Sequence, residues 1–169
     1  MKLLLLPLIL LLSLPAIADS EWDKAALTLP EATEIKVYRS PDCQCCHKWV
    51  EHLKQHQFKV IDLISHDMAS VKQQAGLPAP LASCHTAIVD GYLIEGHVPA
   101  DDIKRLLLDK PDIKGLSVPQ MPVGTPGMEM GSHKDDFTVI QFDHNNQFDI
   151  YNRYQVGTDQ LYHAAPPSE

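Results

Sequence analysis

Four cysteines carry the clearest chemistry in this sequence. Cys43, Cys45 and Cys46 fall within four consecutive positions, and Cys84 follows much later in the chain. If a helix begins here, the Cys43-x-x-Cys46 spacing places both thiols beside the unpaired N–H groups of its first turn. That position lowers the pKa of a thiol and favours thiolate. Thiolate attacks disulfides and binds soft metals, so the spacing indicates a redox site or a metal site.

The third neighbouring thiol favours a metal. A dithiol oxidoreductase needs two sulfurs, and Cys45 would compete with Cys43 and Cys46 for the mixed disulfide. Three or four thiolates satisfy a soft ion, and copper(I) is the soft ion to expect if the apolar N-terminal run from Leu3 to Leu14 exports a bacterial protein. Structural zinc sites bring their ligands as two separated pairs, which this pattern matches poorly. We predict a Cu(I) site formed by all four cysteines, in which Cys43 and Cys46 are the catalytic pair if the protein is redox-active.

Local patterns predict the elements that position these cysteines. Ile35 and Val37 alternate with Lys36 and indicate a strand at 34–38, after which Ser40-Pro41-Asp42 offers caps for the cysteine helix. That helix is predicted to run to about residue 55. The further predicted elements are a buried interior strand at 58–64, a helix at 67–75, a hairpin of 86–89 and 92–95 around Asp90-Gly91, and a helix between Pro99 and Pro111.

The resulting order, βαβαββα, predicts a thioredoxin-like α/β fold with a mixed central sheet and helices on both faces. In that fold the loop before the hairpin faces the cysteine helix and commonly carries a cis-proline. Here the loop is Ser83-Cys84-His85-Thr86, which would bring the fourth sulfur against the other three. The alternative is a disulfide from Cys84 to one of them, without a metal, since the compartment is oxidising.

The rest of the chain is predicted as an addition to this fold. Residues 116–131 are rich in proline and glycine, which excludes helix and inner strand and indicates a loop. Residues 137–142 and 148–151 predict a second hairpin. We divide the chain into a signal peptide at 1–18, an N-terminal tether at 19–33, one metal-binding domain at 34–155 and a tail at 156–169, whose end we expect to fray.

The N-terminus predicts export to a bacterial periplasm. Lys2, an apolar run from Leu3 to Leu14, and small residues at Ala16 and Ala18 fit a secretory signal peptide cleaved after Ala18. The run is shorter than the about 20 residues of a membrane span, so we expect no stable span after cleavage. The net charge is −8 without a Lys/Arg cluster, which disfavours nucleic acid and anionic membranes as partners and tolerates cations.

Some histidines are candidates to complete the site, because imidazole binds both copper oxidation states. His47 and His85 are near the thiols in sequence, and His97 follows the hairpin. For each of them a surface or capping role is the alternative. We assign no role to three others, which fall on predicted polar surfaces: His52, His56 and His66.

The Pro/Gly-rich loop contains three methionines, and thioether is a soft ligand suited to copper(I). Met121, Met128 and Met130 would form a lid over the thiols. Simple packing onto apolar surface is the alternative.

Several short motifs follow one another from about Ile35 to Tyr151. They are Cys43-Gln44-Cys45-Cys46, Trp49, Ser83-Cys84-His85-Thr86-Ala87, Gly91-Tyr92, Glu95-Gly96-His97-Val98-Pro99-Ala100, and the segment from Gly115-Leu116 to Met128-Glu129. Together they resemble the CopG-type periplasmic copper-resistance proteins. The resemblance implies a thioredoxin-like fold, a periplasmic location, a role in copper resistance and a Cu(I) site on the four cysteines that can be multinuclear, with thiol or copper redox activity. Gln44 stands where the family usually has glycine.

Three functions of different classes stay open. The first is a copper(I)-binding protein that acts as sink, carrier or site of copper redox chemistry, with other periplasmic copper-handling proteins as partners. The second is a periplasmic thiol-disulfide oxidoreductase that uses Cys43 and Cys46, and the third is a disulfide-stabilised binding module without chemistry. In air and without metal, we expect one or two disulfides within the four cysteines and copper(I) binding only after reduction.

Overall fold

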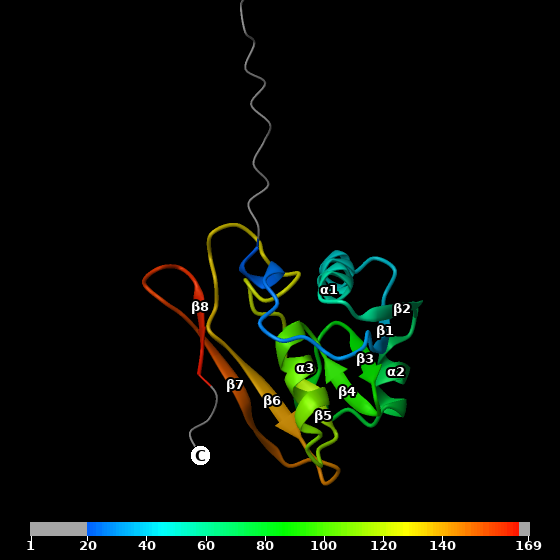
Figure 1. Cartoon of the computed structure of the whole chain (residues 1–169). Coiled ribbons are helices and arrows are strands. Elements are labelled where there is room, and N and C mark those ends of the chain that lie inside the picture. The colour runs from blue at the N-terminus through cyan, green and yellow to red at the C-terminus, as the bar shows by residue number, and fades with distance from the viewer. Residues whose placement is uncertain (1–19, 166–169) are drawn as a thin grey trace, which may run out of the picture.

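A computed structural model describes residues 20–165, which form a mixed α/β structure (Figure 1). The predicted signal peptide and the end of the predicted tail lie outside the described residues. The described part holds three α-helices: α1 (Gln44–Gln55), α2 (Met68–Gln74) and α3 (Ala100–Asp109). Its eight strands are β1 (Glu34–Arg39), β2 (Lys59–Ile64), β3 (Thr86–Val89), β4 (Tyr92–Glu95), β5 (Gly115–Ser117), β6 (Phe137–Phe142), β7 (Phe148–Val156) and β8 (Tyr162–Ala164).

All eight strands join one mixed sheet, in the order β2-β1-β3-β4-β5-β6-β7-β8. The β1–β2 and β4–β5 pairs are parallel, and the other neighbours are antiparallel. Both predicted hairpins are present, and Asp90-Gly91 forms the turn of the first. The sheet is larger than that of a thioredoxin fold, because β5 to β8 extend it beyond β4. Within residues 20–165, none of the helices combines the length and apolarity that crossing a membrane requires.

Buried side chains divide between the two faces of the sheet. Ile35 and Val37 are buried on one face, with Lys36 exposed between them, as the two-residue period of a strand requires. Helices α1 and α3 cover this face and complete the larger core with these residues: Trp49, Val50, Leu53, Ile103 and Leu106. The opposite face holds a smaller core of Leu81, Leu93 and Phe142, and α2 lies on that side. Helices therefore lie on both faces.

Strand β2 differs from the buried interior strand that its apolar run predicts. Among the strands of residues 20–165 it lies at the edge of the sheet and pairs only with β1. Ile61 and Ile64 are exposed. Asp62 makes a bidentate ion pair with Arg39 of the neighbouring strand. A continuous apolar run is typical of interior strands, but it does not report how many neighbours the strand has. The prediction of an interior strand was wrong.

The Pro/Gly-rich segment also differs from its prediction at one end. Residues 115–117 form β5, an inner strand between β4 and β6, although we excluded an inner strand from residue 116 onward. The first residue explains the exception, because a Cβ on Gly115 would lie 1.9 Å from the Leu93 carbonyl oxygen. Only glycine permits this approach of two backbones. Beyond Ser117 the segment is a loop, as predicted.

Both ends of the described chain contain regular structure, in segments that the sequence predicted as a tether and a tail. Residues Glu21–Asp23 form a 3-10 helix whose Trp22 packs edge-on against Phe137, Tyr154 and neighbouring rings. At the other end, β7 continues to Val156 and pairs with β8, within the predicted tail. The N-terminal helix thus lies beside the loop of residues 118–131, as Figure 1 shows.

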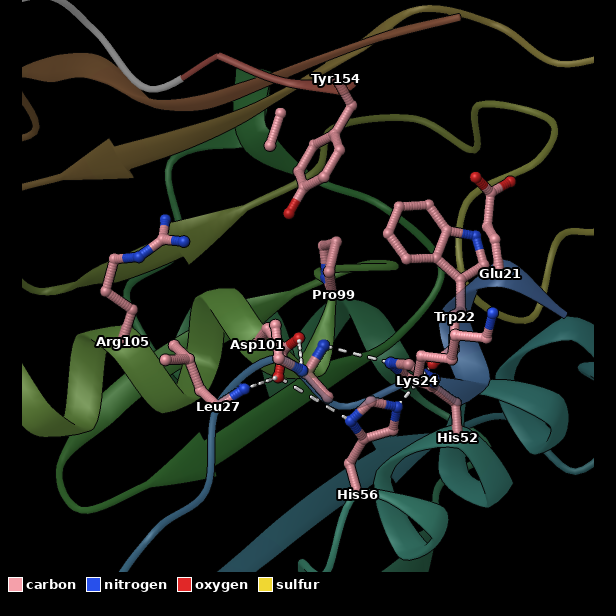
Figure 2. A pocket seen from close by; sticks show the side chains of 13 residues that line it. Glu21, Trp22, Lys24, Leu27, His52, His56, Pro99, Asp101, Arg105 and Tyr154 are labelled. Carbon is pink, nitrogen blue, oxygen red and sulfur yellow. Dashed lines mark hydrogen bonds and ion pairs between the residues drawn. The ribbon is translucent and has the colours of Figure 1, made fainter. Parts of the chain in front are cut away.

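Two histidines that we predicted on polar surfaces are buried. His52 is 6% and His56 is 3% exposed, since α1 turns both rings toward α3 and the N-terminal segment. His52 Nε2 accepts the Ala100 backbone N–H at 3.1 Å, and His56 Nε2 lies 2.6 Å from the Trp22 carbonyl oxygen. They line a hollow of about 300 Å³ beside Trp22 and Asp101 (Figure 2). The predicted exposure of these two histidines was wrong. Their face of α1 would meet solvent in an isolated helix, but in the folded chain α3 and the N-terminal segment cover it.

Candidate metal centre

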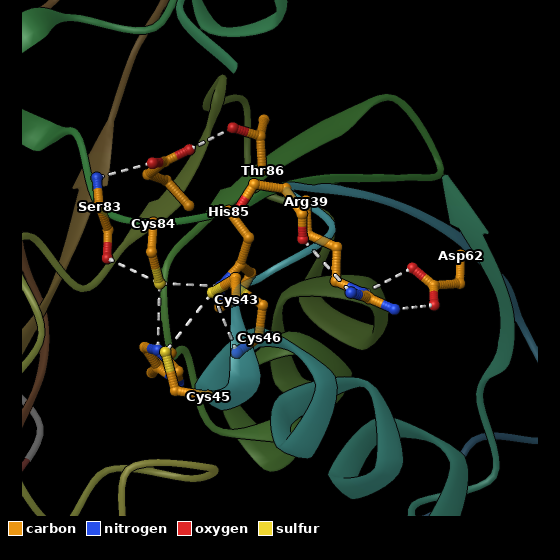
Figure 3. The surroundings of a disulfide bond; sticks show 12 residues. Arg39, Cys43, Cys45, Cys46, Asp62, Ser83, Cys84, His85 and Thr86 are labelled. Atoms are coloured by element: carbon orange, nitrogen blue, oxygen red, sulfur yellow. Dashed lines mark hydrogen bonds and ion pairs between the residues drawn. A yellow bond between two sulfur atoms is a disulfide. The ribbon is translucent and has the colours of Figure 1, made fainter. Parts of the chain in front are cut away.

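The start of α1 positions three of the thiols. Cys43 is the N-cap residue, and its Sγ accepts the Cys46 backbone N–H at 3.3 Å. A disulfide joins Cys43 to the buried Cys46 (Figure 3). Cys45 is a free thiol, with its Sγ 3.5 Å from the Cys43 Sγ. A disulfide confined to the cysteine set agrees with the sequence prediction.

Cys84 completes the cluster from the turn that precedes β3. It is a second free thiol, and its Sγ and those of Cys43, Cys45 and Cys46 all lie within 4.8 Å of one another. The structure therefore brings together the four cysteines that the sequence placed in one site. The loop opposite the cysteine helix carries this sulfur without a cis peptide, since residues 20–165 contain none.

Two imidazoles meet the Cys84 sulfur on its other side. His85 Nδ1 and His97 Nε2 each lie 3.2 Å from Cys84 Sγ, and the three ligand atoms lie within 4.8 Å of one another. Both rings are fully buried. His97 Nδ1 lies 2.8 Å from the Pro126 carbonyl oxygen, whereas His85 Nε2 has no hydrogen-bond partner among residues 20–165. Two of the three histidine candidates thus reach the thiols, while His47 is exposed on α1 and joins neither group.

Burial keeps these groups uncharged without a metal. It lowers the pKa of His97 to about 4, although the hydrogen bond to Pro126 opposes the shift. Burial, with His97 and Lys72 nearby, lowers the pKa of His85 well below its ordinary value. Burial and the adjacent Cys45 raise the pKa of Cys84 to about 12. The metal-free site therefore holds neutral imidazoles and a protonated thiol, and a bound cation would have to displace the thiol proton.

A buried carboxylate that sequence reasoning missed holds the Cys84 turn. Glu95 is fully buried in β4, and its oxygens accept the Ser83 backbone N–H at 2.7 Å and the Thr86 hydroxyl at 2.6 Å. Lys72 of α2 donates to the same carboxylate. These partners flank Cys84 on both sides and fix the backbone that presents its sulfur. The nearest sequence signal is an acidic residue in an otherwise apolar strand beside the His97 motif.

The loop of residues 118–131 covers the cysteine turn with its backbone. Gly127 has φ +84°, and a Cβ there would lie 2.7 Å from the Trp49 backbone N and 2.9 Å from the Cys45 carbonyl oxygen. Of the three methionines, Met128 is buried, whereas Met121 and Met130 are exposed. The loop thus covers the cysteine turn at Gly127, where the missing side chain lets the two backbones approach. A methionine lid of sulfur ligands stays a prediction.

The donor set fits a soft cation. Four converging sulfur atoms are the ligands that copper(I) and other thiophilic ions prefer, and two neutral imidazoles lie beside them. The same sulfurs at a helix N-terminus also fit disulfide exchange. The fold and the site together define a cysteine-rich α/β protein with a candidate soft-metal centre.

Comparison with known proteins gives the family. Two solved structures, both called copper resistance protein copG, are 42% and 43% identical to this chain with TM-scores of 0.71 and 0.70. The matches cover 74% and 73% of this chain and 100% and 98% of those chains. The pattern of a family described as protein of unknown function, DUF411, matches residues 81–128. Curated protein sequences give no match. The chain belongs to the CopG family of copper resistance proteins.

Proposed function

We propose that this protein binds copper(I) in copper resistance, through the thiolates of Cys43, Cys45, Cys46 and Cys84. The observation that carries the proposal is the convergence of the four sulfurs within 4.8 Å. Thiolates favour soft ions such as copper(I), and they also bind zinc, so the sulfur set restricts the metal to the thiophilic ions. Two related structures are copper resistance proteins by name, and they match most of this chain. Four sulfurs can also bridge several ions, so we include a multinuclear copper cluster in the proposal.

The proposed setting is the periplasm, and the proposed fold relationship is thioredoxin-like. The N-terminal sequence supports export, since it has the length, charge and small residues of a cleaved signal peptide. The first part of the structure supports the fold relationship: β1, α1, β2 and the β3–β4 hairpin follow the predicted order, with the cysteines at the start of α1. Other periplasmic copper-handling proteins are the partners that this setting implies.

The same thiols can reduce copper(II). Two copper(II) ions would each take one electron from the thiolates of Cys43 and Cys46, which yields two copper(I) ions and the Cys43–Cys46 disulfide. The Cys43–Cys46 disulfide of the structure is the bond that this reaction would form. In this role the protein is a copper oxidoreductase, with Cys43 and Cys46 as its catalytic residues.

If copper(I) binds to all four thiolates, Cys46 and Cys84 should contribute equally to its affinity although they lie far apart in sequence. Cys84→Ser should weaken copper(I) binding as much as Cys46→Ser, about tenfold or more, because both sulfurs belong to the same donor set. Anaerobic titration of the reduced protein against a colorimetric copper(I) chelator measures this. His47→Gln is the matched control, since His47 is exposed and joins no donor group. Wild-type affinity in the Cys84 variant would remove that residue from the site.

The second candidate function is thiol-disulfide exchange, favoured by the Cys43–Cys46 disulfide at the helix N-terminus. We expect poor reduction of insulin disulfides and thiol-dependent reduction of copper(II) by the same reduced sample. The reason is Cys45, whose sulfur lies 3.5 Å from that of Cys43 and would compete to resolve a mixed disulfide. Fast insulin turnover without copper(II) reduction would favour the oxidoreductase.

A further inference from the structure

A buried arginine joins strand β2 to the turn that presents Cys43. Arg39 is the last residue of β1 and is 8% exposed. Its Nε and Nη2 donate to the two carboxylate oxygens of Asp62 in β2, at 2.9 and 2.8 Å. Its Nη1 donates to the Ser40 carbonyl oxygen at 3.3 Å, and the same oxygen accepts the Cys43 backbone N–H at 3.4 Å. Figure 3 shows this ion pair in the surroundings of the disulfide.

These contacts fix Cys43 at both its sulfur and its backbone. Cys43 is the N-cap of α1, and its Sγ accepts the Cys46 backbone N–H at 3.3 Å. The Ser40 carbonyl holds the Cys43 N–H on the other side, and Arg39 holds that carbonyl. The position of one sulfur of the Cys43–Cys46 pair therefore depends on a turn that β2 supports from a distance.

Asp62 holds the guanidinium in one orientation. Two parallel N–H···O bonds to a carboxylate specify the plane and the direction of an arginine side chain, which a single bond does not. The side chains of Arg39 and Asp62 are 10% and 29% exposed, so water competes little for the arginine end. The backbone of Arg39 is fixed as well, because the Ser65 N–H donates to its carbonyl at 2.9 Å. Arg39 therefore presents Nη1 to Ser40 as a fixed donor.

We propose that Arg39, oriented by Asp62, is a positioning residue for the Cys43–Cys46 pair and favours the disulfide over the two thiols. The proposal deepens the redox role within the proposed function, and its test needs no copper. A disulfide forms more readily when its thiols are already held together, because a fixed turn has less conformational entropy to lose as the bond closes. A turn released from Arg39 loses this advantage, so the dithiol form becomes more populated.

The equilibrium of the Cys43–Cys46 pair with glutathione tests this proposal. The two thiols give two electrons and two protons to glutathione disulfide, which becomes two glutathione molecules, while the protein disulfide forms. The full chain is used without its predicted signal peptide and without metal, and the changes Cys45→Ser and Cys84→Ser isolate the pair. Alkylation followed by mass spectrometry counts the thiols that remain.

We expect Arg39→Met and Asp62→Asn each to shift the equilibrium constant about tenfold toward the dithiol. The double variant should shift it no further, because both residues act through one link. Arg39→Lys should not restore the original constant, since lysine keeps the charge but cannot bond Asp62 and Ser40 together through a planar fork. Hydrogen exchange at the Cys43 amide should accelerate in the same variants, which reports on the turn directly.

Glu51→Gln is the matched control, because it breaks an exposed ion pair with Lys54 near the end of α1 and should leave the constant unchanged. A loss of stability common to both redox forms also leaves it unchanged, so the constant separates positioning from a merely structural role. Circular dichroism checks that each variant folds. An unchanged constant in Arg39→Met and Asp62→Asn would overturn the inference, and so would rescue by Arg39→Lys, which would assign the effect to charge. Copper(I) binding by the reduced wild type decides the proposed function separately.

Discussion

At the scale of single residues, the burial of His52 leads us to expect that stability depends on pH. His52 lies away from the cysteines, at the junction of α1 and α3. Burial, followed by the nearby His56 and Lys104, lowers the pKa of His52 well below 6.5. Its Nε2 must also stay unprotonated to accept the Ala100 backbone N–H. The folded protein therefore requires a neutral ring at this position.

We predict that the free energy of unfolding falls as pH drops below about 6.5, the ordinary value of the histidine pKa. In that window the unfolded chain binds a proton that the folded chain refuses, so stability rises with pH there and is lost on acidification. One such histidine contributes a slope of at most about 1.4 kcal/mol per pH unit. Urea unfolding of metal-free protein between pH 5 and pH 7.5, about the range in which histidine titrates, measures it.

The variant His52→Gln separates this residue from the others. The glutamine side-chain oxygen can still accept the Ala100 backbone N–H but does not titrate. The slope of the free energy of unfolding against pH should therefore lose the contribution of one proton. His66→Gln, at an exposed position, should keep the wild-type slope. A slope unchanged by His52→Gln would mean that this ring is not the acid-sensitive group.

At the scale of elements, the glycines of the covering loop allow a matched comparison. Gly127 and Gly131 both have φ near the left-handed region, at +84° and +78°. A Cβ on Gly127 would contact α1 at Trp49 and Cys45, whereas a Cβ on Gly131 would meet no atom of the described part of the chain within 4 Å. The two positions therefore share the backbone strain and differ in the steric clash.

We predict that Gly131→Ala lowers the free energy of unfolding by about 1 kcal/mol, the cost of the left-handed conformation. Gly127→Ala should cost about 2 kcal/mol more, because the loop must move off the cysteine turn. It should also raise the reactivity of Cys45 toward a thiol reagent. Urea unfolding and thiol-labelling rates measure both effects. If both variants changed the free energy of unfolding and the labelling rate of Cys45 equally, Gly127 would not be in close contact with the cysteine turn.

Local sequence patterns could predict the elements around the cysteines because short-range rules decide them. The alternation at Ile35 to Val37, the apolar face of α1 and the Asp90-Gly91 turn each specify one structure. The position of β2 at the sheet edge and the inner strand β5 could not be predicted in this way. Both depend on which strands become neighbours, and the strand that begins at Gly115 has no local signal until Leu93 is known to lie against it.

The sequence could predict which sulfur atoms form the candidate site. It could not predict the residues that hold Cys84 and His97 in place. Three thiols share one helix start, and the element order placed Cys84 opposite them. The link from Cys84 to His97 joins residues 13 positions apart and depends on the β3–β4 register. The carboxylate of Glu95 and the carbonyl of Pro126 act through tertiary contacts that leave no spacing signal.

At the scale of the whole molecule, the two ends of the described chain hold the covering loop. The Trp22 indole Nε1 donates to the Gly124 carbonyl at 2.8 Å, and its ring lies 5.2 Å from that of Tyr162 in β8. The Tyr162 hydroxyl lies 3.1 Å from the loop carbonyl of Val123 and 2.9 Å from the carbonyl of Asp135, and it can donate to either. Gly127 of the same loop lies on the cysteine turn. The N-terminal segment is therefore mechanically connected to the site through this loop.

We predict that Trp22→Ala loosens the loop and uncovers the thiols. Loss of the half-buried indole should lower the free energy of unfolding by about 2 kcal/mol, below the range for fully buried tryptophan. Hydrogen exchange should accelerate at the loop amides of Gly124 and Met128, which are bonded within the loop. Labelling of Cys45 should accelerate in parallel, because the loop that covers its backbone opens more often.

The variant Trp22→Phe distinguishes ring packing from the hydrogen bond. Phenylalanine keeps an aromatic ring against Phe137 and Tyr154 but cannot donate to the Gly124 carbonyl. It should cost about 1 kcal/mol, the usual contribution of one such bond, and raise exchange at Gly124 more than at Met128. If Trp22→Ala reduces stability without changing exchange in the loop or the labelling of Cys45, the N-terminal segment stabilises the sheet alone, and the covering loop is held by its own contacts with α1.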